Sequence, residues 1–230
     1  MMPAVAFLFD VDNTLLDNDR FEHDLQCWLE GHLGADAAAR YWAAFEIRRQ
    51  HLGYADFLGA VQQCWDGSGR DLRWVPVGEF ILDYPFAERL YPDTLDVLGY
   101  FSGLGPTWLI TDGDGILQPR KLHKAGLWDA VEGRVRIYTH KERRLADIQR
   151  ACPASHYVLI DDKIRILDAV KQRWQGSVTT VLPQQGHYAT RTEDPAPDNP
   201  PDIVVSGIGD LPSHPGLSSL QRITDYKEGA

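Results

Sequence analysis

The sequence predicts an α/β protein in which a doubly wound, mostly parallel sheet carries a helical insertion after its first strand. Short apolar runs recur along the chain, and amphipathic stretches lie between most of them, which is typical of βαβ units. One long region near the N-terminus interrupts this alternation with helical patterns alone. With 43% apolar residues and seven Trp among 230 residues, the chain can bury a large core, so global disorder is excluded.

The apolar runs predict six strands. The first run, residues 4–9, reads AVAFLF and suits a strand that is buried on both faces of a parallel sheet. The other expected strands are residues 107–110, 135–138, 157–160, 178–182 and 203–205. The expected helices between them are residues 92–103, 119–125, 141–151 and 165–174. Residues 183–201, rich in Pro, Gln and Asp, predict a surface loop before the last strand, because Pro has no N–H for a sheet.

Residues 17–90 predict a helical domain inserted into the α/β core, which then comprises residues 1–16 and 91–230. Phe21, Leu25 and Leu29 fall on one face of a first helix, and two further helices follow the same pattern. The residues expected to mark the turns are Gly31, Gly34, Gly53 and residues 67–69. Four of the seven Trp lie in this region, enough to build a small core of its own.

Composition excludes several classes of function. The chain has 23 basic and 33 acidic residues, and its net charge of −10 disfavours binding to nucleic acids and to anionic membrane surfaces. Its three Cys are widely spaced and form neither a paired zinc motif nor a disulfide framework. No apolar run approaches the roughly 20 residues of a membrane span, and the N-terminus lacks a signal-peptide pattern. We expect a soluble cytoplasmic protein, as a monomer or homodimer.

Two acidic pairs follow two of the predicted strands. Asp10 and Asp12 come after the first strand, and their spacing of two predicts that they point together into the space where ligands of open α/β sheets bind. Asp161 and Asp162 follow the run at residues 157–160. Adjacent parallel strands bring both pairs to one edge of the sheet, where carboxylates repel unless a cation compensates them. Asp10, Asp12, Asp161 and Asp162 therefore predict a Mg²⁺ site, because Mg²⁺ prefers carboxylate and water oxygens.

Groups suited to an anion also lie at predicted strand ends. Thr111 offers a hydroxyl and a backbone N–H, and Gly113 and Gly115 permit close backbone approach to an anion. Lys141 follows the strand at residues 135–138 and supplies a positive charge to balance a phosphate and the carboxylates. Lys121 and Lys124, near another strand end, compete with Lys141 for this role.

Four segments in this order resemble the motifs of the haloacid dehalogenase (HAD) superfamily of phosphotransferases, and the resemblance covers nearly the whole chain. The segments are DVDNTL, LITDGD with Thr111, Lys141, and LIDD. The resemblance implies a Rossmann-like core, and the helical insertion resembles the C1-type cap of the phosphoglycolate phosphatase branch. The activity implied is Mg²⁺-dependent hydrolysis of a small phosphomonoester.

The resemblance also implies a role for each matching residue. Asp10 would be the nucleophile that becomes an aspartyl phosphate, and Asp12 the general acid and then the general base. Mg²⁺ would be held by Asp10, the backbone carbonyl of Asp12 and Asp162, with Asp161 as a direct or indirect partner. The residues grouped as phosphate-binding are Thr111, Asp112 and Lys141. In the alternative to a functional role, Asp112 and Asp114 have a structural one and stabilise the turn or cap the next helix.

Several residues depart from the pattern or stay open. Asn13 replaces the commoner Gly, and Asn tolerates unusual turn dihedrals. Lys163 either reaches the site or pairs with Asp161. His187 is the one histidine worth testing, and Arg48 and Arg49 either reach an anionic substrate or form a solvated helix face.

Three other functions remain as alternatives. A 2-haloacid dehalogenase is disfavoured, because its chemistry needs neither Mg²⁺ nor an acid/base group at the position of Asp12. A phosphomutase stays open. A non-catalytic phospho-acceptor or binding module, such as a receiver domain, would have about half this length and its acceptor Asp in mid-chain. The sequence leaves the substrate's identity open.

Overall fold

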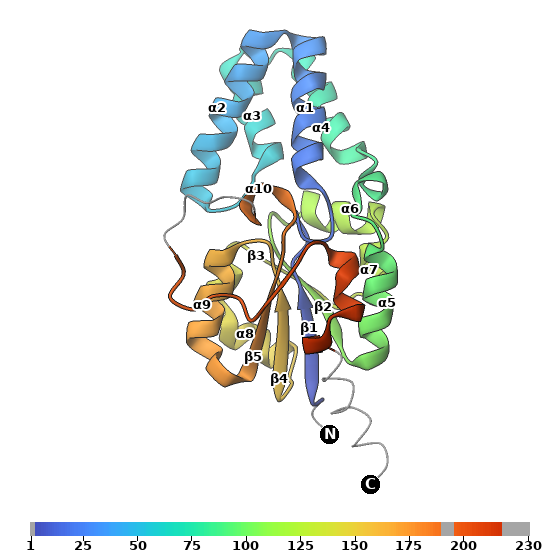
Figure 1. Cartoon of the computed structure of the whole chain (residues 1–230). Helices are drawn as coiled ribbons and strands as arrows, with labels where there is room; N and C mark the ends of the chain where they lie inside the picture. Colours follow the sequence, from blue (N-terminus) through green and yellow to red (C-terminus); the bar gives the residue numbers. More distant parts are fainter. Residues whose placement is uncertain (1–2, 190–195, 218–230) are drawn as a thin grey trace.

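The computed structural model describes residues 3–189 and 196–217, and in this part the chain forms one six-stranded parallel sheet with helices on both faces (Figure 1). The strand order is β3-β2-β1-β4-β5-β6. The strands are β1 (Val5–Phe9), β2 (Thr107–Asp112), β3 (Val135–Tyr138), β4 (His156–Ile160), β5 (Val178–Pro183) and β6 (Ile203–Val205). The predicted fold class is confirmed, and each strand begins within one residue of its expected position.

The central strand β1 explains why the sheet has two cores. Its side chains alternate between the faces, so Phe7 and Phe9 pack against Phe101 on one side. Ala6 and Leu8 belong to the second core on the opposite side. All five residues of β1 are buried, which is why the sequence reads as an unbroken apolar run.

Helices cover both faces of the sheet. The helices that follow β1 and β2 on one side are α5 (Thr94–Leu104), α6 (Leu117–Lys124) and α7 (Leu127–Ala130). On the other side lie α8 (Leu145–Ala151) and α9 (Ile164–Trp174) (Figure 1). The expected helix at residues 141–151 is split, because a short 3₁₀ helix, Lys141–Arg143, precedes α8. Within the described ranges, no helix combines the length and the apolar character needed to cross a membrane.

The region predicted to be helical lies beyond the carboxyl edge of the sheet (Figure 1). Its helices are α1 (Asn18–Leu33), α2 (Ala35–Leu52), α3 (Phe57–Gly67) and α4 (Val75–Asp83), one more than expected. Gly34 and Gly53, with φ of 86° and 83°, end α1 and α2 as predicted. Gly31 was expected to mark a turn but lies inside α1, where an exposed glycine costs only about 1 kcal/mol.

Residues 183–201, between β5 and β6, were predicted to form a loop, and this prediction is wrong at one place. Gly186–Ala189 form a short helix, α10, which contacts α1. Gly186 has a φ of 66°, and a Cβ there would come within 2.4 Å of the Cβ of Asn13, so only glycine fits. Residues 190–195 of the expected loop lie outside the described residues.

Candidate active site

Four charged side chains meet at the carboxyl edge of the sheet, and we call Asp10, Lys141, Asp161 and Asp162 the sheet-edge cluster. The last residues of β1 and β4, Phe9 and Ile160, are register partners, so Asp10 and Asp161 emerge side by side. The Lys141 ammonium contacts the Asp10 carboxylate and lies 2.6 Å from Asp161 Oδ2. Each of the four residues is at most 2% exposed. The predicted convergence of the two acidic pairs therefore holds for three of the carboxylates.

The cluster fits a divalent cation. One carboxylate oxygen each from Asp10, Asp161 and Asp162 can be chosen so that all lie within 4.8 Å of one another. Both carboxylate oxygens of Asp162 are buried and have no hydrogen-bond partner in the described part of the chain. Leaving an ionised carboxylate buried without a partner costs several kcal/mol, and a bound cation would offset that cost. Three hard oxygen donors facing one point are the donor set that Mg²⁺ prefers.

Burial and the neighbouring ammonium groups shift the pKa values of the three carboxyl groups in different directions. Burial alone would raise the pKa of Asp10, but the charges of Lys141 and Lys163 outweigh it and hold that pKa below its ordinary value. Burial raises the pKa of Asp161 and raises that of Asp162 well above its ordinary value. These shifts favour the ionised form of Asp10, whereas a bound cation would stabilise the ionised form of Asp162.

Asp12 lies apart from the cluster, which corrects the expectation that all four carboxylates point together. Strand β1 ends at Phe9, so the alternation of a strand does not extend to Asp12. Its Oδ1 lies 2.7 Å from the Lys121 ammonium, and its Oδ2 lies 3.4 Å from Gln118 Nε2. The side chain is 22% exposed and lines a cavity. The assignment of its backbone carbonyl as a metal ligand stays a prediction.

The residues predicted to bind phosphate are Thr111 and Asp112, which lie on β2, and Lys141, which follows β3. The Thr111 hydroxyl accepts a hydrogen bond of 2.9 Å from Gln118 Nε2. Asp112 Oδ1 accepts the backbone N–H of Lys141 at 2.8 Å, so this carboxylate orients the segment that carries Lys141. Asp114 Oδ1 accepts the N–H groups of Ile116 and Leu117, which confirms its predicted role at the start of the next helix.

Three lysines competed for the place beside the carboxylates, and the structure separates them. Lys141 lies in the sheet-edge cluster. Lys121 is equally buried but pairs with Asp12. Lys124 is partly exposed and lies 3.3 Å from Asp83 on the surface.

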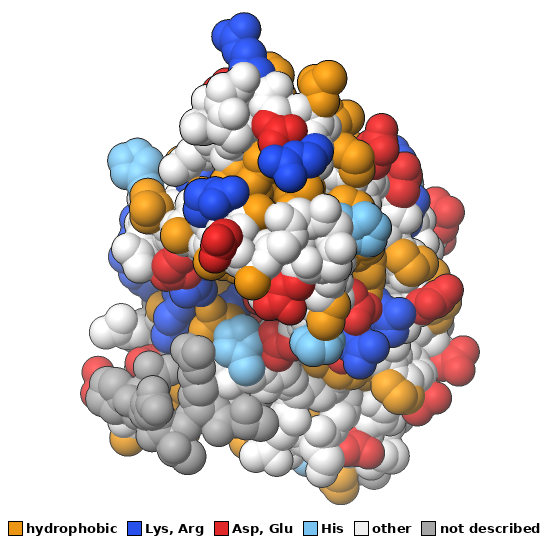
Figure 2. All heavy atoms as spheres, turned by 90° about the horizontal axis from the view of Figure 1, so that it is seen from above, with side chains coloured by type: hydrophobic (Ala, Val, Ile, Leu, Met, Phe, Trp, Pro, Cys, Tyr) orange, Lys and Arg blue, Asp and Glu red, His pale blue; other side chains and the backbone are white. Residues whose placement is uncertain are grey.

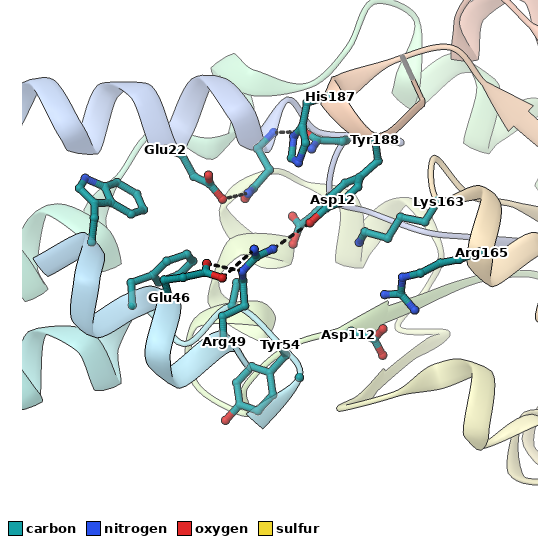
Figure 3. Close-up of a pocket in the computed structure, with 16 residues that line it drawn as sticks. Asp12, Glu22, Glu46, Arg49, Tyr54, Asp112, Lys163, Arg165, His187 and Tyr188 are labelled. Carbon is teal, nitrogen blue, oxygen red and sulfur yellow. Dashed lines mark hydrogen bonds and ion pairs between the residues drawn. The ribbon is translucent and has the colours of Figure 1, made fainter. Parts of the chain in front are cut away.

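A cavity of about 440 Å³ lies between the sheet edge and the helices beyond it (Figure 3). Glu22 from α1 and Glu46 and Arg49 from α2 line one side. Asp12, Asp112, Lys163 and Arg165 line the side nearer the sheet, and His187 and Tyr188 of α10 close it. Seen from above, basic and acidic side chains alternate over the helices without a broad patch of either sign (Figure 2).

The structure places the basic residues whose roles the sequence left undecided. Lys163 reaches the cavity, where its ammonium lies 5.3 Å from the centre of the Tyr188 ring. Arg49 also lines the cavity and donates a hydrogen bond of 2.9 Å to the Tyr188 hydroxyl, whereas Arg48 pairs with Asp56. His187 Nδ1 lies 2.6 Å from Asp19 Oδ1.

Asn13, which replaces the commoner Gly, has a structural reason. Its φ is 62°, a conformation that Asn tolerates better than most residues. Its side-chain oxygen accepts the N–H groups of Asn18 and Asp19 at 2.9 and 3.2 Å. Asn13 therefore turns the chain and satisfies the first donors of α1, which glycine cannot do.

Comparison with solved structures decides the family. A HAD-like hydrolase from Burkholderia xenovorans is 47% identical to this chain, with a TM-score of 0.88, and the match covers 93% of this chain and 97% of that one. The chain belongs to the HAD-like hydrolases. Neither a family model nor a curated protein matches it.

More distant structures share the fold of this HAD-like hydrolase. An L-2-haloacid dehalogenase is 16% identical with a TM-score of 0.62, covering 92% of this chain and 98% of its own. The HAD-hydrolase YfnB of Bacillus subtilis, described as bound to magnesium, is 14% identical with the same TM-score, covering 91% and 97%. Dehalogenases and a magnesium-bound hydrolase thus have this fold, so the fold alone does not select the reaction.

Two residues of this HAD-like hydrolase surround Asp12: Gln118, which was not singled out from the sequence, and Lys121, which was weighed only as an alternative to Lys141. Gln118 and Lys121 both point from α6 toward the DVD segment. Their spacing of three residues places them on one helix face, and this signal was available in the sequence. Glu22 was missed as well, and no pattern in the sequence distinguishes it from the other acidic residues of α1.

Proposed function

We propose that this HAD-like hydrolase is a Mg²⁺-dependent phosphatase acting on a small phosphomonoester. The observation that carries the proposal is Asp162, whose two buried carboxylate oxygens have no partner among the described residues, beside Asp10 and Asp161. Hydrolysis of a haloacid gives no reason to gather three carboxylates that need a cation, whereas phosphoryl transfer does. Asp12, placed at the cavity, adds the acid/base group that a phosphatase requires and a dehalogenase does not.

The reaction would proceed in two displacements. In the first, an oxygen of Asp10 forms a bond to phosphorus as the bond from phosphorus to the ester oxygen breaks, and Asp12 gives that oxygen a proton. In the second, Asp12 takes a proton from a water molecule that attacks the aspartyl phosphate, and inorganic phosphate leaves. Lys141 and Thr111 would hold the phosphoryl oxygens during both displacements. Mg²⁺, held by Asp10, Asp162 and the Asp12 carbonyl, would offset the charge of the phosphate.

The helices of residues 17–90 would act as the cap domain over the core of residues 1–16 and 91–230. The cavity between them has room for a small molecule, and its far wall is formed by α1 and α2. The hydrogen bond from Arg49 to Tyr188 joins α2 to α10 across this cavity. A cap in this position would exclude water and select the leaving group, and movement between cap and core would admit the substrate.

Hydrolysis of p-nitrophenyl phosphate tests the proposal. We expect release of nitrophenol and inorganic phosphate with Mg²⁺, and loss of both on adding EDTA. Asp10→Asn should lower kcat by at least about 10³-fold, because the nucleophile is gone. Asp129→Asn, which removes an exposed carboxylate on α7, is the matched control and should behave as the wild type.

A second assay separates the alternatives. Wild-type protein that releases halide from chloroacetate without Mg²⁺, and no phosphate from any of a panel of phosphorylated metabolites, would refute the proposal in favour of a dehalogenase. Equal activity of the Asp10→Asn and wild-type proteins would refute the assignment of the nucleophile.

A further inference from the structure

Lys121 is a buried cation that the reaction outlined above does not use. It is 1% exposed, and its ammonium lies 5.8 and 5.6 Å from the ring centres of Phe21 and Phe86. Within this apolar surrounding, its polar contacts are Asp12 Oδ1 at 2.7 Å and Asn18 Oδ1 at 2.9 Å. Burying an ammonium costs several kcal/mol, and removing its partner would leave that cost uncompensated.

Packing alone does not account for a lysine at this position. Leu117 and Leu122 already bury the apolar face of α6. A hydrophobic side chain of similar volume would fill the space between Phe21 and Phe86 without desolvating a charge, and such replacements are often neutral or stabilising. The contact that such a replacement would lose is the ion pair between Lys121 and the carboxylate of Asp12.

Helix α6 presents donors to both oxygens of that carboxylate. Lys121 contacts Oδ1, and Gln118, three residues earlier, lies 3.4 Å from Oδ2 while donating to Thr111 at 2.9 Å. Asp12 follows the last residue of β1 by three positions, where its backbone forms an isolated β-bridge with Leu16 and its side chain is partly exposed to the cavity. The donors of α6 therefore decide where this carboxyl group lies.

We propose that Lys121 is a positioning residue that holds the carboxyl group of Asp12 against the leaving-group side of the cavity. This inference rests on the proposed phosphatase function and extends it. As the bond between phosphorus and the ester oxygen breaks, the proton of the Asp12 carboxyl group moves to that oxygen, and a carboxyl group that can swing away transfers it less often. The more basic the leaving oxygen, the more the reaction depends on this proton.

The contacts of Lys121 also connect Asp12 to the helical region. Asn18, the first residue of α1, accepts from Lys121 through Oδ1 and donates to Glu22 through Nδ2 at 3.0 Å. Glu22 lines the cavity wall. A leaving group that contacts this wall therefore lies at the end of a hydrogen-bonded chain that begins at the acid, and Asn18→Ala should loosen the chain without leaving a buried charge unpaired.

Two aryl esters whose leaving groups differ in basicity, phenyl phosphate and p-nitrophenyl phosphate, test the inference. We expect Lys121→Met to lower kcat/KM for phenyl phosphate by roughly 10- to 100-fold, within the range of general acid catalysis, and to lower that for p-nitrophenyl phosphate by a clearly smaller factor. Lys121→Arg should recover part of the loss, because it keeps the charge and the donors. Lys124→Met removes a cation from the surface of the same helix and should match the wild type with both esters.

Further variants keep the inference falsifiable if Lys121→Met does not fold, as judged by circular dichroism. Asn18→Ala and Lys121→Arg should then show the same unequal loss at smaller size. In an Asp12→Asn background, Lys121→Met should add no further loss with phenyl phosphate, because the group that it positions is absent.

Equal losses with the two esters, or additive losses in the double variant, would overturn the inference and make Lys121 a structural residue. Wild-type protein with no phosphatase activity would overturn the proposed function as well. Active wild-type protein with equal losses would overturn the role of Lys121 alone.

Discussion

The sheet-edge cluster and the cavity wall formed by α1 and α2 differ in the burial and the pairing of their charged side chains. Asp10, Asp161 and Asp162 are at most 2% exposed, and the buried Lys141 ammonium contacts the first two of them. On the cavity wall, Glu22 is partly buried and accepts a hydrogen bond from Asn18, while Glu46 pairs with Arg49 near the surface. The cluster is buried and places three carboxylates beside one lysine, whereas the wall is partly exposed and pairs Glu46 with Arg49.

The difference corresponds to two tasks. A dry site strengthens every interaction with a phosphate or a cation, because the effective dielectric constant is low. A partly solvated wall adapts to a leaving group and costs little when it is empty. Asp12 lies between the two, held by Lys121 on one side and open to the cavity on the other. We expect substitutions to have the largest effect in the cluster, a smaller effect on the wall, and the smallest effect at the contact between Arg49 and Tyr188.

The largest effect is expected in the cluster, from Asp162→Asn. Mg²⁺ at 100 times its Kd should stabilise the wild type by about 2.7 kcal/mol, and the variant should lose this stabilisation together with most of its phosphatase activity. Without Mg²⁺ the variant should be at least as stable as the wild type at neutral pH, because burial raises the pKa of Asp162 and the charged form is unfavourable. Thermal denaturation with and without Mg²⁺ measures both effects.

Asp129→Asn serves again as the control and should keep the full response to Mg²⁺. A variant at Asp162 that still gains stability from Mg²⁺ would show that the cation binds elsewhere, and the cluster would then no longer differ from the wall in its need for a metal.

A smaller effect is expected on the wall, from Glu22→Gln. Burial and the charge of Asp19 raise the pKa of Glu22 from 4.5 to about 7. A raised pKa in the folded state means that the contribution of Glu22 to stability is complete below pH 4.5 and is lost as the pH rises through 7. The wild type should therefore lose roughly 1–3 kcal/mol relative to Glu22→Gln between pH 5.5 and 8.5, in urea unfolding.

Glu46→Gln is the matched control on the same wall. Hydrogen bonds from Arg49 and Gln50 lower the pKa of Glu46, so its contribution is present above its ordinary pKa and is lost only as the pH falls below it. Between pH 5.5 and 8.5 this variant should show the pH dependence of the wild type. Identical pH profiles for the Glu22→Gln and wild-type proteins would show that Glu22 is solvated.

The smallest effect is expected from Tyr188→Phe, which removes the hydroxyl that accepts from Arg49 across the cavity. One hydrogen bond contributes about 1 kcal/mol, so KM should rise by about fivefold while kcat changes less. Tyr100→Phe, whose hydroxyl donates to Pro212 O away from the site, is the control. Unchanged KM in Tyr188→Phe would show that this contact has no part in closing the cavity.

The sequence alone determined the sheet, because buried parallel strands must be apolar at every position and the six runs have this property. It also predicted acidic residues at the ends of two strands, and the structure makes these strands, β1 and β4, neighbours, so that Asp10 and Asp161 emerge side by side. The sequence left Lys141 in competition with Lys121 and Lys124, and the structure places Lys141 beside Asp10 and Asp161. The HAD-like motifs point to the same residues.

Only the tertiary structure decided what surrounds Asp12. Lys121 is more than 100 positions away along the chain and reaches Asp12 because α6 packs beside the start of α1. Packing around α1 also buries Glu22 enough to raise its pKa, whereas Glu30 of the same helix is exposed. Strand patterns report which residues lie at a sheet edge, but the partners that helices bring to that edge depend on packing between elements, and local sequence does not encode it.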